Sequence, residues 1–64
     1  MNSREVIKRA LAAGWVLDRI NGDHHTFKHP DNDLLLTIVH PKREIGAGLL
    51  RRYEKITGLN LRKK

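Results

Sequence analysis

The chain has 64 residues, and its 13 Lys and Arg against seven Asp and Glu give a formal net charge of +6 at neutral pH. A chain of this length forms one domain with a thin core, because it buries only about 60% of the surface that its unfolded form exposes. It contains no cysteine, which excludes disulfides and thiolate zinc sites and fits a reducing cytoplasm. We expect neither a secretory leader nor a membrane span, since charges interrupt every long apolar stretch.

The first predicted element in chain order is a helix over residues 3–13. Its apolar residues recur at helical spacing and form one stripe; they are Val6, Ile7, Ala10 and Leu11. Asn2 or Ser3 can cap its N-terminus. Gly14 can end it, because glycine tolerates the left-handed conformation of a C-terminal cap.

Three strands are predicted next, over residues 15–20, 24–29 and 34–39. Asn21-Gly22 between the first two is a strong hairpin signal. The polar residues 31–33 indicate a turn before the third strand. This third strand is the most apolar of the three, so we expect it to be central in the sheet or well covered.

After an irregular connection, a second helix is predicted over residues 47–57, where apolar side chains recur at intervals of three and four and Gly58 can end the helix. The order α-β-β-β-α predicts an α+β fold, in which both helices cover one face of a three-stranded antiparallel sheet. We expect a domain over residues 1–59, followed by a loose basic tail over residues 60–64.

The sheet face that the helices leave open carries candidate functional residues. Side chains alternate along a strand. If Phe27 points to the core, then His24, Thr26 and Lys28 point to the open face. This pattern predicts an imidazole and an ammonium group side by side on an exposed surface.

Histidine is unusually frequent, at positions 24, 25, 29 and 40. It exchanges protons near neutral pH, and RNA cleavage requires such exchange, because the ribose 2′-hydroxyl already supplies the nucleophile. For His24-His25 a merely polar strand segment is an equal alternative, and a zinc site is a weak one, since the two rings point to opposite faces. His25 and His29 are favoured as partly buried, hydrogen-bonded residues, and His40 either is structural or lines the RNA surface.

The strong positive charge favours a polyanion as partner, with nucleic acid first and an acidic protein second. Basic residues on or beside the open face suit contacts to phosphate, which hold an RNA backbone without reading its sequence. These residues are Arg19, Lys28, Lys42 and Arg43. For each one alone, a solvated surface charge is the default alternative.

The sequence resembles the HicA toxin family from residue 1 to about residue 59. The resemblance is carried by Asn2-Ser3, Gly14-Trp15, the pattern Gly-x-His-His-x-Phe-x-His-Pro over residues 22–30, and His-Pro-Lys-Arg over residues 40–43. It implies a fold similar to the double-stranded RNA-binding domain. It also implies a metal-independent ribonuclease, needing no cofactor, that degrades messenger RNA in the cytoplasm, and a HicB-type antitoxin that covers the active surface. The family's catalytic histidine is the first of the pair, which corresponds to His24.

The chain departs from the family pattern at four positions. Asp23 stands where serine is usual, so a carboxylate adjoins the expected catalytic histidine. Val39 and Gly46 stand where proline is usual, and Leu49 replaces threonine. These changes concern the rigidity of the connection and the level of activity.

We therefore expect an endoribonuclease in which His24 is the general acid or base and Lys28 stabilises charge. The residues expected to hold RNA are Arg19, Lys42 and Arg43. A non-catalytic RNA-binding module fits the charge and the element order equally well, but such a module has no need of an imidazole on the open face. A DNA-binding regulator is less favoured, because three strands separate the two helices.

Overall fold

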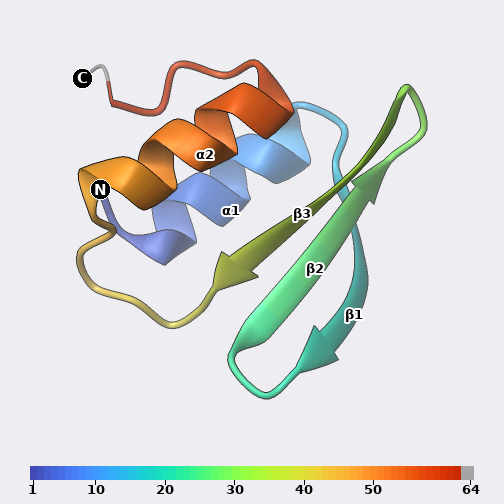
Figure 1. The fold of residues 1–64 in the computed structure, drawn as a ribbon. Coiled ribbons are helices and arrows are strands. Elements are labelled where there is room, and N and C mark those ends of the chain that lie inside the picture. The colour runs from blue at the N-terminus through green and yellow to red at the C-terminus, as the bar shows by residue number, and fades with distance from the viewer. Residues whose placement is uncertain (63–64) are drawn as a thin grey trace.

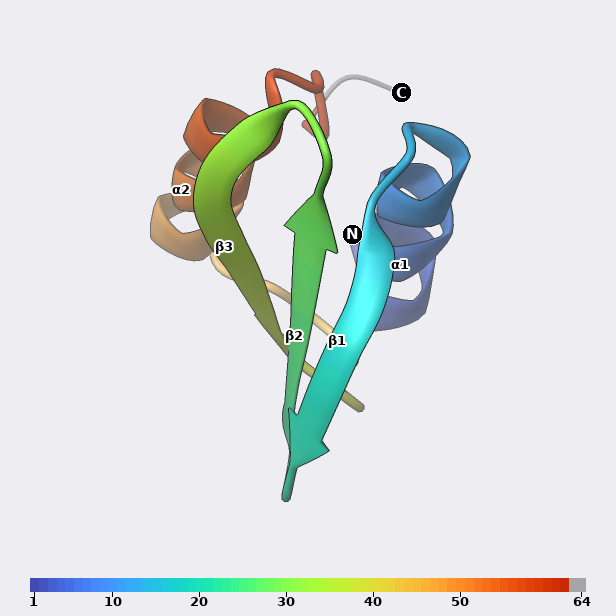
Figure 2. The ribbon, with the colours of Figure 1, turned by 90° about the vertical axis from the view of Figure 1, so that its right-hand side faces the viewer.

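A computed structural model describes residues 1–62. The elements are α1 (Ser3–Ala12), β1 (Val16–Asn21), β2 (His24–His29), β3 (Asn32–Val39) and α2 (Ala47–Thr57). The two helices lie on the same face of an antiparallel sheet (Figure 1), with α2 beside β3 and α1 beside β1 (Figure 2). This confirms the predicted α+β fold and its α-β-β-β-α order. Within the described residues, no helix is long and apolar enough to cross a membrane.

The strands are ordered β1-β2-β3, so the middle strand is β2. The most apolar strand was expected to be central or well covered. It is neither, because β3 lies at an edge of the sheet, next to α2 (Figure 2), and only Leu36 and Ile38 on it are buried. Some of its apolar side chains are buried in the core and others are exposed to solvent. Leu36 and Ile38 are fully buried, whereas Leu34 and Leu35 are 55% and 48% exposed.

The turn before β3 is shorter than predicted. Asn32 already pairs with His29 in the sheet, which leaves only Pro30 and Asp31 in the turn. The side chain of Asn32 fixes this arrangement, because its amide donates to the carbonyl of Ile56 at 3.0 Å and its oxygen accepts from the Leu34 N–H at 2.8 Å.

The core lies between the helices and the sheet. Its buried members come from both helices, from β2 and β3, and from the connecting and C-terminal segments, but not from β1: Val6, Ala10, Trp15, Phe27, Leu36, Ile38, Ile45, Leu50, Tyr53 and Leu61. The stripe of α2 points into this layer, as the spacing predicts. In α1, Val6 and Ala10 do so and Ile7 packs against them, whereas Leu11 is 51% exposed and does not belong to the buried stripe. Because all of this apolar burial is on one face of the sheet, the opposite face is left without a covering layer.

A close contact at the end of α1 explains the Gly14-Trp15 motif. Gly14 has a φ of +100°, and a Cβ there would lie 2.8 Å from His29 Nε2. His29 Nε2 donates to the Ala13 carbonyl at 3.0 Å, while His29 Nδ1 accepts from the Asp31 N–H at 3.0 Å. The Trp15 ring packs on His29 edge to face, with 5.2 Å between centroids. The expectation of a partly buried, hydrogen-bonded His29 is confirmed.

The C-terminal segment is better ordered than expected. Leu61 is only 1% exposed, and the N–H groups of Leu61 and Arg62 donate to the Glu54 carboxylate at 2.9 and 3.3 Å. Desolvation raises the pKa of Glu54, but these bonds and the Arg62 guanidinium outweigh it and hold the pKa below its ordinary value of 4.5. The expectation of a loose tail is therefore wrong for residues 60–62, and residues 63–64 lie outside the described part.

Replacing Gly14 with alanine tests the contact with His29. Gly22 is the matched control, because it also has a positive φ, of +63°, but nothing lies within 4 Å of its added Cβ. Gly22→Ala is expected to lower the free energy of unfolding by about 1 kcal/mol, which is the cost of the left-handed backbone. Gly14→Ala is expected to cost about 1–3 kcal/mol more, because the methyl group displaces His29. Urea denaturation followed by circular dichroism measures both, and equal losses would contradict this explanation.

Candidate active site

His24 is the first residue of β2 and follows the hairpin turn directly. Its backbone pairs with Asn21 on one side and Val39 on the other. Because Phe27 points into the core, strand alternation places His24 on the uncovered face. Its side chain is 59% exposed, so the ring is accessible to a ligand.

A carboxylate contacts this ring. Asp23 Oδ1 lies 3.1 Å from His24 Nδ1. The contact is an ion pair when the imidazole is protonated. The residue that departs from the family pattern thus places a negative charge next to Nδ1 of the ring.

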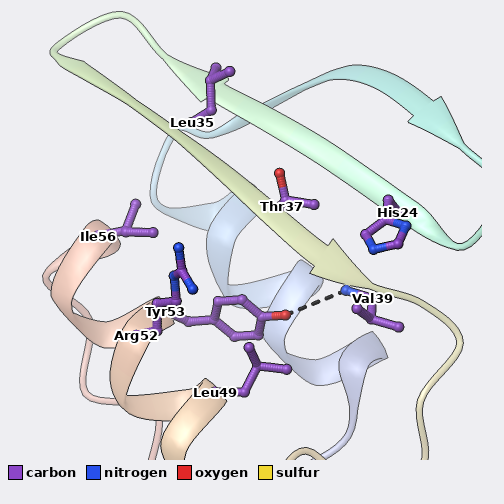
Figure 3. A pocket seen from close by; sticks show the side chains of 8 residues that line it. All are labelled: His24, Leu35, Thr37, Val39, Leu49, Arg52, Tyr53 and Ile56. Atoms are coloured by element: carbon purple, nitrogen blue, oxygen red, sulfur yellow. Dashed lines mark hydrogen bonds between the residues drawn. The ribbon is translucent and has the colours of Figure 1, made fainter.

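A hollow of about 300 Å³ lies beside His24, between β3 and α2 (Figure 3). Strand β3 contributes the outward-facing side chains of Leu35, Thr37 and Val39. Helix α2 contributes Leu49, Arg52, Tyr53 and Ile56. Figure 3 shows His24 and Val39 at one end of the hollow. A ligand in this hollow would therefore be next to the imidazole.

Two hydroxyl groups on α2 and β3 have defined partners near the hollow. The Tyr53 hydroxyl accepts from the Val39 N–H at 3.4 Å, and burial raises the pKa of this phenol. Thr37 Oγ1 lies 3.2 Å from Thr26 Oγ1. Thr26 is on the open face but is only 6% exposed, because Arg19 and Thr37 flank it on the neighbouring strands. The expectation that Thr26 is exposed is therefore wrong.

Arg52 is the cation of the hollow. It is exposed, no acidic residue lines the hollow, and no carboxylate among residues 1–62 forms an ion pair with it. The sequence places Arg52 on the polar side of the second helix, among the basic residues that suit phosphate contact, but does not show that it lies near His24. The spacing of Leu49, Arg52 and Ile56 places them on one side of a helix, but only the position of α2 beside the edge of β3 turns that side toward His24.

Arg19 and Lys28 share the open face with His24 but lie further along the sheet. Lys28 is four residues from His24 on β2, which is about 13 Å at the rise of a strand. Asp18 lies between the two cations, 2.7 Å from Arg19 Nη1 and 3.6 Å from Lys28 Nζ. The expected side-by-side placement of His24 and Lys28 is therefore wrong, and Asp18 partly neutralises both basic groups.

Lys42 and Arg43 lie elsewhere, in the connection between β3 and α2. They line a second hollow, of about 570 Å³, together with the start of α1. Arg4 and His40 are also part of its wall. The five sequence-predicted residues thus occupy three places: His24 at the first hollow, Arg19 and Lys28 along the sheet, and Lys42 and Arg43 at the second hollow.

Ser3 and His40 connect the second hollow to the turn that carries His24. Ser3 Oγ accepts from the Lys42 N–H at 2.8 Å and lies 2.7 Å from His40 Nδ1. The Ser3 N–H donates to the Lys42 carbonyl at 2.9 Å, and the His40 N–H donates to the Asp23 carbonyl at 2.8 Å. His40 thus has a structural role, and it also lines the second hollow. His25 is half-buried and packs edge-on against the His40 ring, with 5.0 Å between centroids.

Within residues 1–62, no group of three or more His, Cys, Asp or Glu side chains could hold a metal ion. The site offers an imidazole next to a carboxylate, at one end of a hollow whose wall includes a guanidinium. Such a set of groups can accept a proton and stabilise an anion.

Fold and site define a small, basic α+β protein with an exposed histidine on an uncovered sheet face. The family model described as "HicA toxin of bacterial toxin-antitoxin" matches residues 3–59. The chain therefore belongs to the HicA toxin family, and is a toxin of a bacterial toxin–antitoxin system. No curated protein matches the chain at a significant level.

A solved structure supports the same assignment. In a HicA3 and HicB3 toxin–antitoxin complex, one chain is 37% identical to this one and superposes with a TM-score of 0.84. The match covers 95% of this chain and 98% of that chain. The similarity thus extends over essentially the whole fold.

Replacing Ser3 with alanine tests the hydrogen bonds that hold α1 to the connection. The change leaves the Lys42 N–H and His40 Nδ1 without their partner in a buried place. We expect the free energy of unfolding to fall by about 1–3 kcal/mol. Urea denaturation measures the change, and an unaltered midpoint would show that solvent replaces the hydroxyl without cost.

Proposed function

We propose that this toxin is an endoribonuclease that cleaves messenger RNA, with His24 as its proton carrier and without a metal or other cofactor. The observation that carries the proposal is the exposed imidazole of His24, which lies 3.1 Å from the Asp23 carboxylate and at one end of a hollow lined by Arg52 and by no acidic residue. Membership of the HicA toxin family and the net charge of +6 support it.

The reaction needs no nucleophile from the protein. His24 Nε2 takes the proton of a ribose 2′-hydroxyl, and the 2′-oxygen forms a bond to the adjacent phosphorus. The bond from phosphorus to the 5′-oxygen then breaks, and this leaving oxygen takes a proton from water. The Asp23 carboxylate stabilises the imidazolium that results. The products are a 2′,3′-cyclic phosphate and a 5′-hydroxyl.

Arg52 stabilises the negative charge that builds on the phosphate. A guanidinium suits this role, because its planar donors can bind two phosphate oxygens together. Arg52 takes the place that the sequence suggested for Lys28, which lies about 13 Å from His24 along β2. Lys28 and Arg19 are proposed to hold the RNA backbone beyond the cut, and Lys42 and Arg43 to hold a further stretch at the second hollow.

Replacing His24 with alanine is expected to lower the rate of RNA cleavage by about 10²–10⁴-fold, because the proton carrier is lost. Affinity for an RNA that cannot be cut should change little, and the urea midpoint should be unaltered, since the side chain is exposed. Denaturing gels of a labelled, unstructured RNA measure cleavage. Full cleavage by the variant would remove His24 from the mechanism.

The substrate supplies the control for this experiment. An RNA with a single 2′-deoxyribose at the cut site lacks the nucleophile and should not be cleaved there, whereas cutting should continue when a chelator is added. If the unaltered protein binds RNA but creates no new ends, it is an RNA-binding module and the proposal fails.

We also propose that a HicB-type antitoxin binds this chain and covers the His24 surface in the cytoplasm, where messenger RNA is translated. The support is the related HicA3 chain, which is in complex with HicB3. Expression of this chain alone is expected to arrest growth, and co-expression of the protein encoded in the adjacent reading frame is expected to restore it. Growth curves and co-purification check this. Failure of that protein to bind the chain would contradict the pairing.

A further inference from the structure

We propose that the hollow between β3 and α2 binds one unpaired base of a single-stranded RNA, while Arg52 holds a neighbouring phosphate. This inference rests on the proposed function, because it takes RNA as the ligand. It adds what that function leaves open, namely the place where a base is bound and the strandedness of the substrate.

The walls of the hollow suit the flat faces of a base. Leu35 forms one wall from β3, and Leu49 and Ile56 form the other from α2 (Figure 3). Leu35 is 48% exposed and the other two are half-buried, so a bound base would cover apolar surface that water contacts now. Bases removed from their stack are commonly held between apolar or aromatic side chains.

The polar groups of the hollow suit the edge of a base and its phosphate. Thr37 is exposed and presents a hydroxyl that can donate or accept a hydrogen bond. Arg52 supplies positive charge, and no acidic side chain lines the hollow to oppose an anion. A purely apolar protein segment would leave the Arg52 guanidinium without an anionic partner, whereas a nucleotide offers both an apolar face and an anion.

The position of His24 favours the same occupant. His24 lies at the end of the hollow, beside Val39 (Figure 3). Leu35 lies four residues along β3 from Val39, which pairs with His24, so this end of the hollow is about 13 Å from the imidazole. A base held between Leu35 and Ile56 would therefore belong to a nucleotide next to the one whose ribose lies at His24.

Entry of a base into this hollow requires an unpaired nucleotide. In a duplex each base is stacked and paired, and turning it outward costs free energy that a single strand does not have to supply. Sequence-specific proteins likewise bind RNA mostly at unpaired bases. The chain is therefore expected to act on single-stranded segments, although its element order resembles that of domains that bind double-stranded RNA by shape.

Two adjacent leucines provide a matched test. Leu34 and Leu35 are similarly exposed, but strand alternation points them to opposite faces, and only Leu35 lines the hollow. The probe is a fluorescein-labelled single-stranded RNA of about twelve nucleotides with 2′-fluoro groups throughout, which lacks the nucleophile. Fluorescence anisotropy gives its Kd for the unaltered protein, Leu35→Ser and Leu34→Ser, and circular dichroism checks that all three fold. We expect Leu35→Ser to weaken binding by about five- to tenfold and Leu34→Ser by less than about twofold.

An abasic scan of the same RNA then tests whether Leu35 contacts a base. One position is expected at which loss of the base weakens binding by about tenfold for the unaltered protein and for Leu34→Ser. For Leu35→Ser, removal of that base should weaken binding by less than about twofold, because this variant already lacks the contact between Leu35 and the base. Equal affinities of the two variants, or the same abasic penalty in both, would overturn the proposal and leave the hollow to a protein partner.

This experiment separates the inference from the proposed function. Cleavage of unmodified RNA is measured independently. Coupling between Leu35 and one base without any cleavage would support the base site and refute the ribonuclease. Cleavage without coupling between Leu35 and a base would support the ribonuclease and refute the base site. An absence of RNA binding would refute the base site as well.

Discussion

The buried hydroxyl of Ser3 is the contact on which the geometry of the site depends. It bonds the first turn of α1 to Lys42 and His40, and the backbone of His40 in turn holds the carbonyl of Asp23. His24 therefore follows a turn that is held by the pairing of Asn21 with His24 and by the hydrogen bond from the His40 N–H to the Asp23 carbonyl. A domain of this size buries little apolar surface and is only marginally stable. A buried polar group without a hydrogen-bond partner would therefore be costly. In the described residues, no buried side-chain nitrogen or oxygen lacks a partner.

Features that follow from local chemistry could be predicted from the sequence. Both helices were found from apolar spacing and their capping residues, and α2 begins and ends at the predicted residues, Ala47 and Thr57. The hairpin between β1 and β2 followed from Asn21-Gly22. The exposure of His24 followed from alternation with Phe27, because the period of a strand is fixed by its backbone.

Features that depend on contacts between distant residues could not be predicted in this way. The hollow exists because α2 lies beside the edge of β3, and the periodicity of a helix does not show which strand it meets. Lys28 shares the face of His24, but its distance along β2 and its pairing with Asp18 needed the sheet register. The burial of Leu61 likewise depends on Glu54, whose helical position alone does not show that it binds the C-terminal segment.

The irregularity at Asp18 has a consequence for the free edge of the sheet. The register of β1 against β2 shifts between Leu17 and Arg19, so Asp18 is an extra residue in the ladder. Strand β1 is an edge strand, and Val16, Leu17 and Ile20 on it are all largely exposed. A regular apolar edge invites strand-to-strand addition of another chain, and a bulge that carries charge interrupts that template. The same aspartate that contacts two cations on the open face thereby makes this edge a poorer template for an added strand.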